Sequence, residues 1–195
     1  MVKAVFLDRD GTIVDDPPPG FLHEPGKVKL LPGAAAAIKR LNDHGFLVVV
    51  VTNQSGIARG LYTVSDYEAV QERLGALLTA QGAHIDAAFF CPHHPRFTGP
   101  CECRKPGLKL FRDAQAALNI DLGQSWWVGD RLSDIQPAAE LGRSRGSAGA
   151  ERQEGKAILV ATGEGNLDQG QARATGVMVV ADLSAAVADI LKDCS

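Results

Sequence analysis

The sequence lacks the features that would suggest a membrane or a nucleic-acid partner. It has no apolar run of about 18 residues, the length that a helix needs to cross a bilayer. The formal net charge of −3 at pH 7 gives no electrostatic reason to expect nucleic acid. A basic segment leading into an apolar signal region is also missing at the N-terminus, so we expect a cytoplasmic protein.

Cysteine is scarce and unevenly distributed. The chain has 4 cysteines in 195 residues, and most of them lie within residues 91–103. Because disulfides are rare in a reducing compartment, this cluster indicates a metal site. Three thiols and one imidazole form a closed tetrahedral set typical of structural zinc. His94 is the rival of His93 as the imidazole ligand, and the predicted zinc ligands are Cys91, His93, Cys101 and Cys103.

The length and the patterning indicate one α/β domain. The 195 residues are enough for one such domain and too few for two of full size, and no internal repeat is visible. Short apolar runs alternate with helical patterns, which predicts parallel strands joined by right-handed crossovers. We therefore predict a three-layer, doubly wound, mainly parallel sheet, as a single domain over residues 1–195.

The individual elements follow from periodicity and from start and stop signals. Strands are expected over 4–7, 46–51, 85–90, 126–128, 157–160 and 177–180. Helices are expected over 32–44, 65–81, 108–118, 132–141 and 183–191. Ser65 and Glu68 form a capping-box signature at the start of the second helix. The segments 143–155 and 163–176 are expected to be a surface insertion and a linker.

Polar residues stand where three of the expected strands end. Asp8 follows the first strand, Thr52 the second and Asp130 the fourth. The carboxyl ends of parallel strands share one edge of the sheet, which is where ligands bind in open α/β folds. An aspartate there can attack phosphorus without an activating base, provided that a cation such as Mg²⁺ offsets the repulsion between two anions. The alternative is that Asp8 and Asp10 only cap or turn the chain.

Four motifs stand in order along the chain, and they are Asp8-Arg9-Asp10-Gly11-Thr12, Thr52-Asn53-Gln54, Lys105-Pro106 and Gly129-Asp130 with Asp134. They resemble the motifs of the haloacid dehalogenase superfamily of phosphatases. Within it, residues 52–60, 91–95 and 101–106 are similar to the heptose 1,7-bisphosphate phosphatases. The histidinol-phosphate phosphatase branch shares the zinc loop and the superfamily motifs. The resemblance covers about residues 3–142 and resumes weakly over 157–163.

The resemblance implies a Mg²⁺-dependent phosphatase acting through an aspartyl-phosphate. It would remove the C7 phosphate of D-glycero-D-manno-heptose 1,7-bisphosphate, giving heptose 1-phosphate for nucleotide-activated heptose biosynthesis. Asp8 would be the nucleophile, and Asp10 the proton donor and acceptor. Thr52 and Lys105 would stabilise the phosphoryl group. Mg²⁺ would be held by the Asp8 carboxylate, the Asp10 backbone carbonyl and Asp130, with Asp134 next to these ligands.

Substrate recognition is expected from Asn53, Arg59 and Arg104, and the zinc loop would position Arg104 and Lys105. Neither residues 12–32 nor 63–89 leave room for a large cap domain, so only loops would roof the site. The expected partner is a small sugar bisphosphate, and we expect a monomer. The competing interpretations are a histidinol-phosphate phosphatase, a phosphotransferase that uses an acceptor other than water, and a zinc-stabilised binding module whose phosphatase site has decayed.

Overall fold

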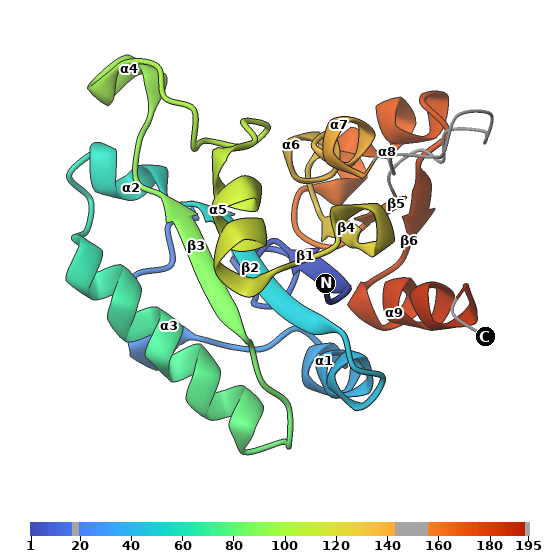
Figure 1. Cartoon of the computed structure of the whole chain (residues 1–195). Coiled ribbons are helices and arrows are strands. Elements are labelled where there is room, and N and C mark those ends of the chain that lie inside the picture. Colours follow the sequence, from blue (N-terminus) through green and yellow to red (C-terminus); the bar gives the residue numbers. More distant parts are fainter. Residues whose placement is uncertain (17–19, 143–155, 194–195) are drawn as a thin grey trace.

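The computed structural model describes residues 1–16, 20–142 and 156–193. Within these ranges, one sheet of six parallel strands has the order β3-β2-β1-β4-β5-β6. Helices cover both faces of this sheet (Figure 1). The predicted three-layer, doubly wound architecture is therefore confirmed.

The bounds of the elements are as follows. The strands are β1 (Ala4–Leu7), β2 (Leu47–Asn53), β3 (Ala87–Cys91), β4 (Trp126–Gly129), β5 (Lys156–Val160) and β6 (Met178–Val180). The helices are α1 (Ala34–Asp43), α2 (Ser55–Ala58), α3 (Val64–Thr79), α4 (Pro95–Thr98), α5 (Lys109–Leu118), α6 (Leu132–Ile135), α7 (Ala138–Leu141), α8 (Gly165–Ala174) and α9 (Leu183–Lys192). Short 3₁₀ turns lie at Pro25–Lys27 and Leu122–Gln124.

Two apolar layers hold the helices on the sheet. Alternate strand residues point to opposite faces, so Val5 and Val50 pack toward α1, α3 and α9, while Phe6 and Trp127 pack toward α5. The rings of Phe6 and Trp127 stack with their centroids 5.2 Å apart. Both faces of β1 are buried, which explains its short, uniformly apolar sequence.

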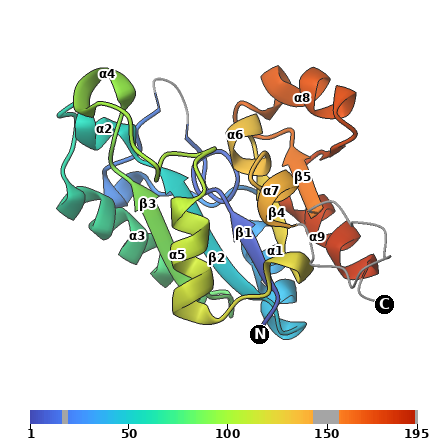
Figure 2. The ribbon, with the colours of Figure 1, turned by 45° about the horizontal axis from the view of Figure 1, so that its top comes forward.

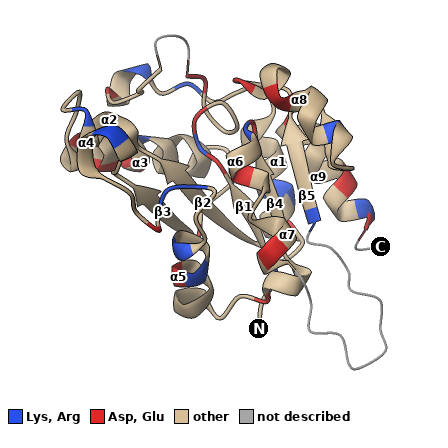
Figure 3. Cartoon of the chain, turned by 90° about the horizontal axis from the view of Figure 1, so that it is seen from above, with Lys and Arg blue, Asp and Glu red and all other residues tan. Residues whose placement is uncertain are grey.

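Charged residues are almost absent from the strands. Figure 3 shows them on the loops and helices around the sheet, and Lys156 at the start of β5 is the one charge within the described strands. At the carboxyl edge of the sheet, α2 and α4 lie on one side and α6 and α8 on the other (Figure 2). Among the described residues no separate domain covers this edge, as predicted. No described helix combines the length and the apolar character needed to cross a bilayer.

The predicted starts of two helices are wrong. Helix α1 begins at Ala34 and not at Pro32, because Gly33 adopts a left-handed conformation with φ of +77°. The capping box of α3 consists of Thr63 and Asp66, two residues before the predicted pair. The Thr63 side chain accepts from the Asp66 N–H, and the Asp66 carboxylate accepts from the Thr63 N–H at 2.7 Å. Aspartate fills the place of the usual glutamate, which hid the signal.

Two further predictions, both in the C-terminal half, are also corrected. The single helix predicted over 132–141 is interrupted between α6 and α7, where Pro137 has no N–H to continue the hydrogen-bond ladder. The linker predicted over 163–176 contains α8. The glycines and polar residues of this segment are typical of a linker, but the segment forms a helix that buries Ala172 against Ile135 and Leu159. The insertion predicted over 143–155 lies outside the described residues.

Candidate active site

The ends of the central strands surround a cleft of about 730 Å³. Asp8 follows β1, Thr52 lies in β2 and Asp130 follows β4, and all of them line the cleft. The sheet register accounts for this, because β1 pairs in parallel with both β2 and β4. The convergence predicted from the strand ends is therefore present in the fold.

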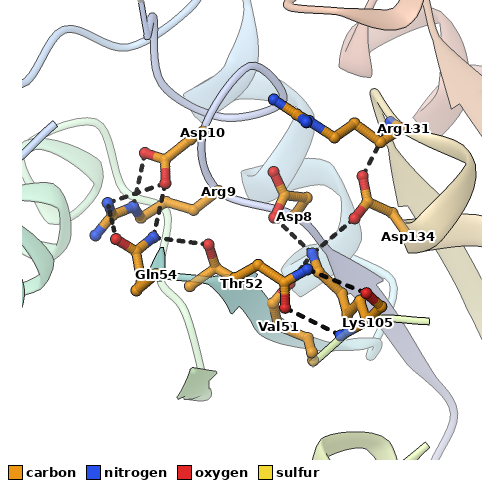
Figure 4. A network of polar contacts seen from close by, with 10 residues as sticks. Asp8, Arg9, Asp10, Val51, Thr52, Gln54, Lys105, Arg131 and Asp134 are labelled. Carbon is orange, nitrogen blue, oxygen red and sulfur yellow. Dashed lines mark hydrogen bonds and ion pairs between the residues drawn. The ribbon is translucent and has the colours of Figure 1, made fainter. Parts of the chain in front are cut away.

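Lys105 lies buried at the floor of the cleft. Its Nζ is 2.6 Å from Oδ1 of Asp8 and 2.8 Å from Oδ1 of Asp134, and it donates to the Val51 carbonyl at 2.5 Å (Figure 4). These contacts use all the protons of the ammonium group. Burial alone would lower the pKa of Lys105, but the carboxylates of Asp134 and Asp8 raise it above the usual value. The side chain is thus a fixed positive charge beside Asp8.

The Asn53 side chain holds Lys105 in position through two hydrogen bonds to the Lys105 backbone. The Asn53 Oδ1 accepts from the Lys105 N–H at 3.0 Å, and the Asn53 Nδ2 donates to the Lys105 carbonyl at 3.3 Å. Because the amide is engaged in this clamp, its evident task in the structure is to hold Lys105 against β2. Asn53 also lines the cleft, and its contact with the substrate stays a prediction.

Asp8, Asp130 and Asp134 form an acidic cluster. Each brings a carboxylate oxygen within 4.8 Å of the others. Burial raises the pKa of Asp8 to about 7, although Lys105 opposes the shift. Burial and repulsion from Asp8 and Asp134 raise the pKa of Asp130 to about 8. Burial and mutual repulsion make the ionised form of these carboxylates unfavourable. A cation bound among them would stabilise that form, so the cluster indicates a cation site.

The hydrogen-bond partners of the two Asp130 carboxylate oxygens show whether a metal ion would fit here. Its Oδ2 accepts from the Glu164 N–H at 2.8 Å, whereas its buried Oδ1 has no hydrogen-bond partner among the described residues. Buried carboxylate oxygens seldom stay without a partner. A hard cation with oxygen ligands, such as Mg²⁺, would satisfy Oδ1 and neutralise the cluster, so the residues fit this metal.

The side chain of Asp10 points away from this cluster, toward Arg9 and Gln54 (Figure 4). Arg9 donates from Nε to Oδ1 at 2.9 Å and from Nη2 to Oδ2 at 3.0 Å. Gln54 donates from Nε2 to Oδ2 of Asp10 at 2.7 Å and to Oγ1 of Thr52 at 2.8 Å. Since Thr52 accepts this bond, its own hydroxyl hydrogen is free to be donated to a ligand in the cleft.

The predicted zinc ligands come together beside the cleft. Sγ of Cys91 lies 3.0 Å from that of Cys103 and 3.7 Å from that of Cys101. Nδ1 of His93 lies 3.2 Å from Sγ of Cys103. These separations approach the ~3.8 Å between sulfurs bound at ~2.3 Å to a tetrahedral zinc. All the ligand atoms lie within 4.8 Å of one another, so the group could hold zinc.

His94, the alternative ligand, faces another way. Its Nε2 lies 3.2 Å from Nη2 of Arg59, and its Nδ1 accepts from the Arg96 N–H. Its ring therefore contacts Arg59 and the backbone of α4, and it is not part of the cysteine group.

Two arginines line the cleft on the side of α2 and α4. The Arg59 guanidinium lies 5.4 Å from the ring centroids of both Phe21 and Phe97. Arg104 directly follows the last cysteine of the zinc group, and its Nη1 donates to the His93 carbonyl at 3.4 Å. Both predicted substrate-binding arginines thus reach the cleft, held by aromatic rings in one case and by the zinc loop in the other.

Sequence reasoning missed several side chains of the cleft. They are Asp16, Tyr62, Arg131 and Glu164, together with Arg9 and Gln54 behind Asp10. Burial and repulsion from Asp10 raise the pKa of Asp16 to about 6. The available signals were the charge of Arg9 between two aspartates, the place of Gln54 directly after Thr52 and Asn53, and that of Arg131 directly after Asp130.

Known proteins are similar to this chain in sequence and in fold. The family model described as polynucleotide kinase 3 phosphatase matches residues 3–178. D-glycero-beta-D-manno-heptose-1,7-bisphosphate 7-phosphatase from Yersinia pestis is 38% identical over 194 residues, covering 95% of each chain. The enzyme of that name from Escherichia coli K12 is 42% identical over 142 residues, covering 70% of this chain and 73% of the relative.

A solved structure is similar over almost all of the chain. The crystal structure of D,D-heptose 1,7-bisphosphate phosphatase from B. bronchiseptica, complexed with magnesium and phosphate, superposes with a TM-score of 0.84 at 35% identity. The match covers 98% of this chain and 99% of the other.

Proposed function

The chain belongs to the family of D-glycero-beta-D-manno-heptose-1,7-bisphosphate 7-phosphatases, and on this premise we propose that it removes the C7 phosphate of heptose 1,7-bisphosphate and leaves the phosphate at C1. The observation that carries the proposal is the buried contact between Asp8 and Lys105 at the floor of a cleft lined by an acidic cluster. The product, heptose 1-phosphate, would feed nucleotide-activated heptose biosynthesis. We propose the β anomer as substrate, in line with the relatives.

The proposed reaction has two halves, both centred on Asp8. A carboxylate oxygen of Asp8 attacks the phosphorus, the bond from phosphorus to the sugar oxygen breaks, and Asp10 gives that oxygen a proton. Water then attacks the phosphorus, the bond to Asp8 breaks, and Asp10 takes a proton from the water. Thr52 donates its free hydroxyl hydrogen, and Lys105 supplies fixed positive charge, to the oxygens of the phosphoryl group.

Mg²⁺ is the cofactor that suits the acidic cluster. Asp8, Asp130 and the backbone carbonyl of Asp10 would hold it, and its chemistry would be to offset the charge of the phosphate and of the attacking carboxylate. Asp134 supports this arrangement by anchoring Lys105 with Oδ1 and accepting the Arg131 N–H with Oδ2. Its role in the proposal is therefore to orient its neighbours.

Zinc would have a structural role. With three thiolates and one imidazole the coordination is complete, so no position is left for substrate. The ion would fix the loop that carries Arg104 and Lys105 directly after Cys103. Arg104 and Arg59 are proposed to bind the part of the sugar bisphosphate that does not react, because planar guanidinium groups suit a second phosphate.

The described chain supplies every group of the proposed site, which supports a monomer as the working form. Light scattering coupled to gel filtration tests this proposal. We also propose that the protein acts in the cytoplasm, where a soluble phosphorylated sugar is retained.

The test of substrate class is a comparison of kcat/KM. Phosphate release with Mg²⁺ is measured for both anomers of heptose 1,7-bisphosphate and for histidinol phosphate, and ³¹P spectra identify the phosphate that remains. We expect a clear preference for the β bisphosphate with the C1 phosphate retained. A preference for histidinol phosphate would instead identify the protein as a histidinol-phosphate phosphatase, the second candidate in the same superfamily. Transfer to added acceptor alcohols would instead indicate a phosphotransferase, and no turnover at all would support a binding module.

A further inference from the structure

We infer that Arg9 and Gln54 are positioning residues for Asp10, and that they leave Oδ1 of Asp10 as the oxygen that gives and takes the proton. The inference rests on the proposed function, in which Asp10 is the proton donor and acceptor. Neither residue is proposed to touch the substrate.

The Arg9 side chain has no contact with solvent, so its charge must be compensated by neighbouring groups of the protein. Its side chain is 0% exposed, and its guanidinium lies 5.3 Å from the ring centroid of Tyr67. Nε and Nη2 both donate to Asp10, and Nη2 also reaches the carbonyl of Leu22 at 3.4 Å. A guanidinium is costly to bury unless its partners are fixed. The fold therefore keeps Arg9 and Asp10 together as one unit.

Gln54 fixes the other side of the same carboxylate. Its Oε1 accepts from the Tyr62 hydroxyl at 2.6 Å and from Nη2 of Arg9 at 3.3 Å. Because arginine can only donate, Oε1 must face it, and Nε2 must face Asp10 and Thr52. The amide has a partner on every side, so it cannot rotate without losing a buried hydrogen bond.

Counting lone pairs distinguishes the two oxygens of Asp10. Oδ2 accepts two hydrogen bonds, from Nη2 of Arg9 and from Nε2 of Gln54, whereas Oδ1 accepts one, from Nε of Arg9. A carboxylate oxygen offers two lone pairs. One lone pair of Oδ1 is therefore free, and the Asp10 side chain is 18% exposed at the cleft.

In this proposal, Oδ1 of Asp10 carries the proton in both halves of the reaction. In the first half of the reaction the proton on Oδ1 moves to the sugar oxygen as its bond to phosphorus breaks. In the second half the water loses a proton to Oδ1 as its oxygen bonds to phosphorus. Arg9 and Gln54 exchange no proton; they hold the plane of the carboxylate for both halves.

Leaving-group dependence separates positioning from a general structural role. 4-Nitrophenolate leaves without a proton, whereas a sugar alkoxide needs one. Because kcat/KM includes only the steps up to departure of the first product, it isolates this proton transfer. We compare kcat/KM for heptose 1,7-bisphosphate and 4-nitrophenyl phosphate in the wild type, Arg9→Lys and Asp10→Asn. Arg112→Lys, the same change at an exposed arginine of α5, is the matched control.

We expect Arg9→Lys to lose at least about tenfold on the sugar bisphosphate and less than about threefold on the nitrophenyl ester, in the direction set by Asp10→Asn. Arg112→Lys should change neither value. Equal losses of Arg9→Lys on both esters, or no loss on either, would overturn the inference while leaving the role of Asp10 intact. If Asp10→Asn itself fails to separate the two esters, the proposed role of Asp10 fails and the inference with it.

A second variant keeps the test valid if Arg9→Lys does not fold. Gln54→Met removes one of the two bonds to Oδ2 and leaves Arg9 in place. Its ratio of kcat/KM between the sugar bisphosphate and the nitrophenyl ester should fall below that of the wild type, with the fold verified by circular dichroism. An unchanged ratio in a folded Gln54→Met protein would overturn the inference.

Discussion

Nζ of Lys105 lies 2.6 Å from Oδ1 of Asp8, and both side chains are buried. The same Nζ contacts Asp134 at 2.8 Å, so one cation is shared between two carboxylates. In the resting protein, Lys105 compensates the negative charge of Asp8 and Asp134. In the proposed reaction, it also compensates the negative charge of the phosphoryl group. Stability and catalysis therefore depend on the same atom.

Replacing Lys105 by methionine should damage both properties. The change leaves two buried carboxylates without their cation, which typically costs about 3–5 kcal/mol of unfolding free energy. Turnover should fall by a factor of at least about 10² because the phosphoryl oxygens lose their positive charge. Urea unfolding and steady-state kinetics measure the two effects. A Lys105→Met protein with the stability and rate of the wild type would refute the shared role. Lys109→Met on the exposed face of α5 is the control.

Mg²⁺ should stabilise the fold, and more so at high pH. The pKa values of Asp8 and Asp130 rise from 3.8 to about 7 and about 8 in the folded protein. The folded state therefore binds more protons than the unfolded state in this interval, so the stability of the metal-free protein falls as pH rises from about 4 to about 8. Mg²⁺ offsets this loss only where the carboxylates are ionised.

Melting temperatures at pH 5 and pH 8, with and without Mg²⁺, test this dependence. We expect a clear upward shift with Mg²⁺ at pH 8, a smaller shift at pH 5, and little shift at either pH in Asp130→Asn. A shift of equal size in Asp130→Asn would place the ion elsewhere.

Gly163 approaches the acidic cluster so closely that a side chain cannot fit. A Cβ atom at this position would lie 2.2 Å from Oδ2 of Asp130 and 2.7 Å from Cα of Gly11. Gly163→Ala should therefore displace Asp130 and weaken both Mg²⁺ binding and turnover, by at least about tenfold in kcat/KM, since small displacements of groups that position the reaction are costly.

Gly176 is the matched control for this change. Its φ is +78° against +54° at Gly163, so alanine is strained at both sites, but a Cβ at Gly176 would meet nothing within 4 Å. We expect Gly176→Ala to cost about 1 kcal/mol of stability and no activity. Equal activity of the two alanine variants would show that Asp130 tolerates the displacement.

Removing zinc should affect substrate binding before chemistry. Arg104 and Lys105 directly follow Cys103, and Arg104 also bonds to the carbonyl of His93. In protein shown by elemental analysis to lack zinc, we expect KM for the bisphosphate to rise at least about tenfold, because the guanidinium that orients the substrate is no longer held in place. The fall in kcat should be smaller. Cys101→Ser should reproduce the pattern, and unchanged kinetics in zinc-free protein would speak against a role for the metal in positioning.

The sequence was most informative where chemistry and topology coincide. Asp8, Thr52 and Asp130 each end a buried strand, and a parallel sheet leaves them one edge on which to meet. The cysteine group was predictable because thiols and imidazole have few other uses in such a pattern. For the cysteine group the one-residue spacing of the ligands is a weaker signal, and the resemblance to known phosphatases strengthened the prediction.

The sequence was least informative where a tertiary contact decides the outcome. The sequence places Arg9 and Gln54 next to predicted site residues. It does not show that their side chains bind the Asp10 carboxylate, because those contacts depend on the turn after β1. The helix α8 was overlooked because its glycines, Asn166 and Asp168 have low helix propensity, while its stability comes from packing Ala172 against β5 and α6. The capping box of α3 was predicted two residues too late for a different, local reason, because Asp66 takes the place of the usual glutamate.

Trapping the phosphorylated enzyme tests the central claim most directly. Asp10→Asn should accept the phosphoryl group from 4-nitrophenyl phosphate, whose leaving group needs no proton, but should hydrolyse the intermediate slowly because the base for water is lost. Rapid acid quenching and peptide mass spectrometry should then find one phosphoryl group on Asp8, and none in the double variant with Asp8→Asn. Phosphoryl on another residue, or full turnover by Asp8→Asn alone, would contradict the assignment of Asp8 as the nucleophile.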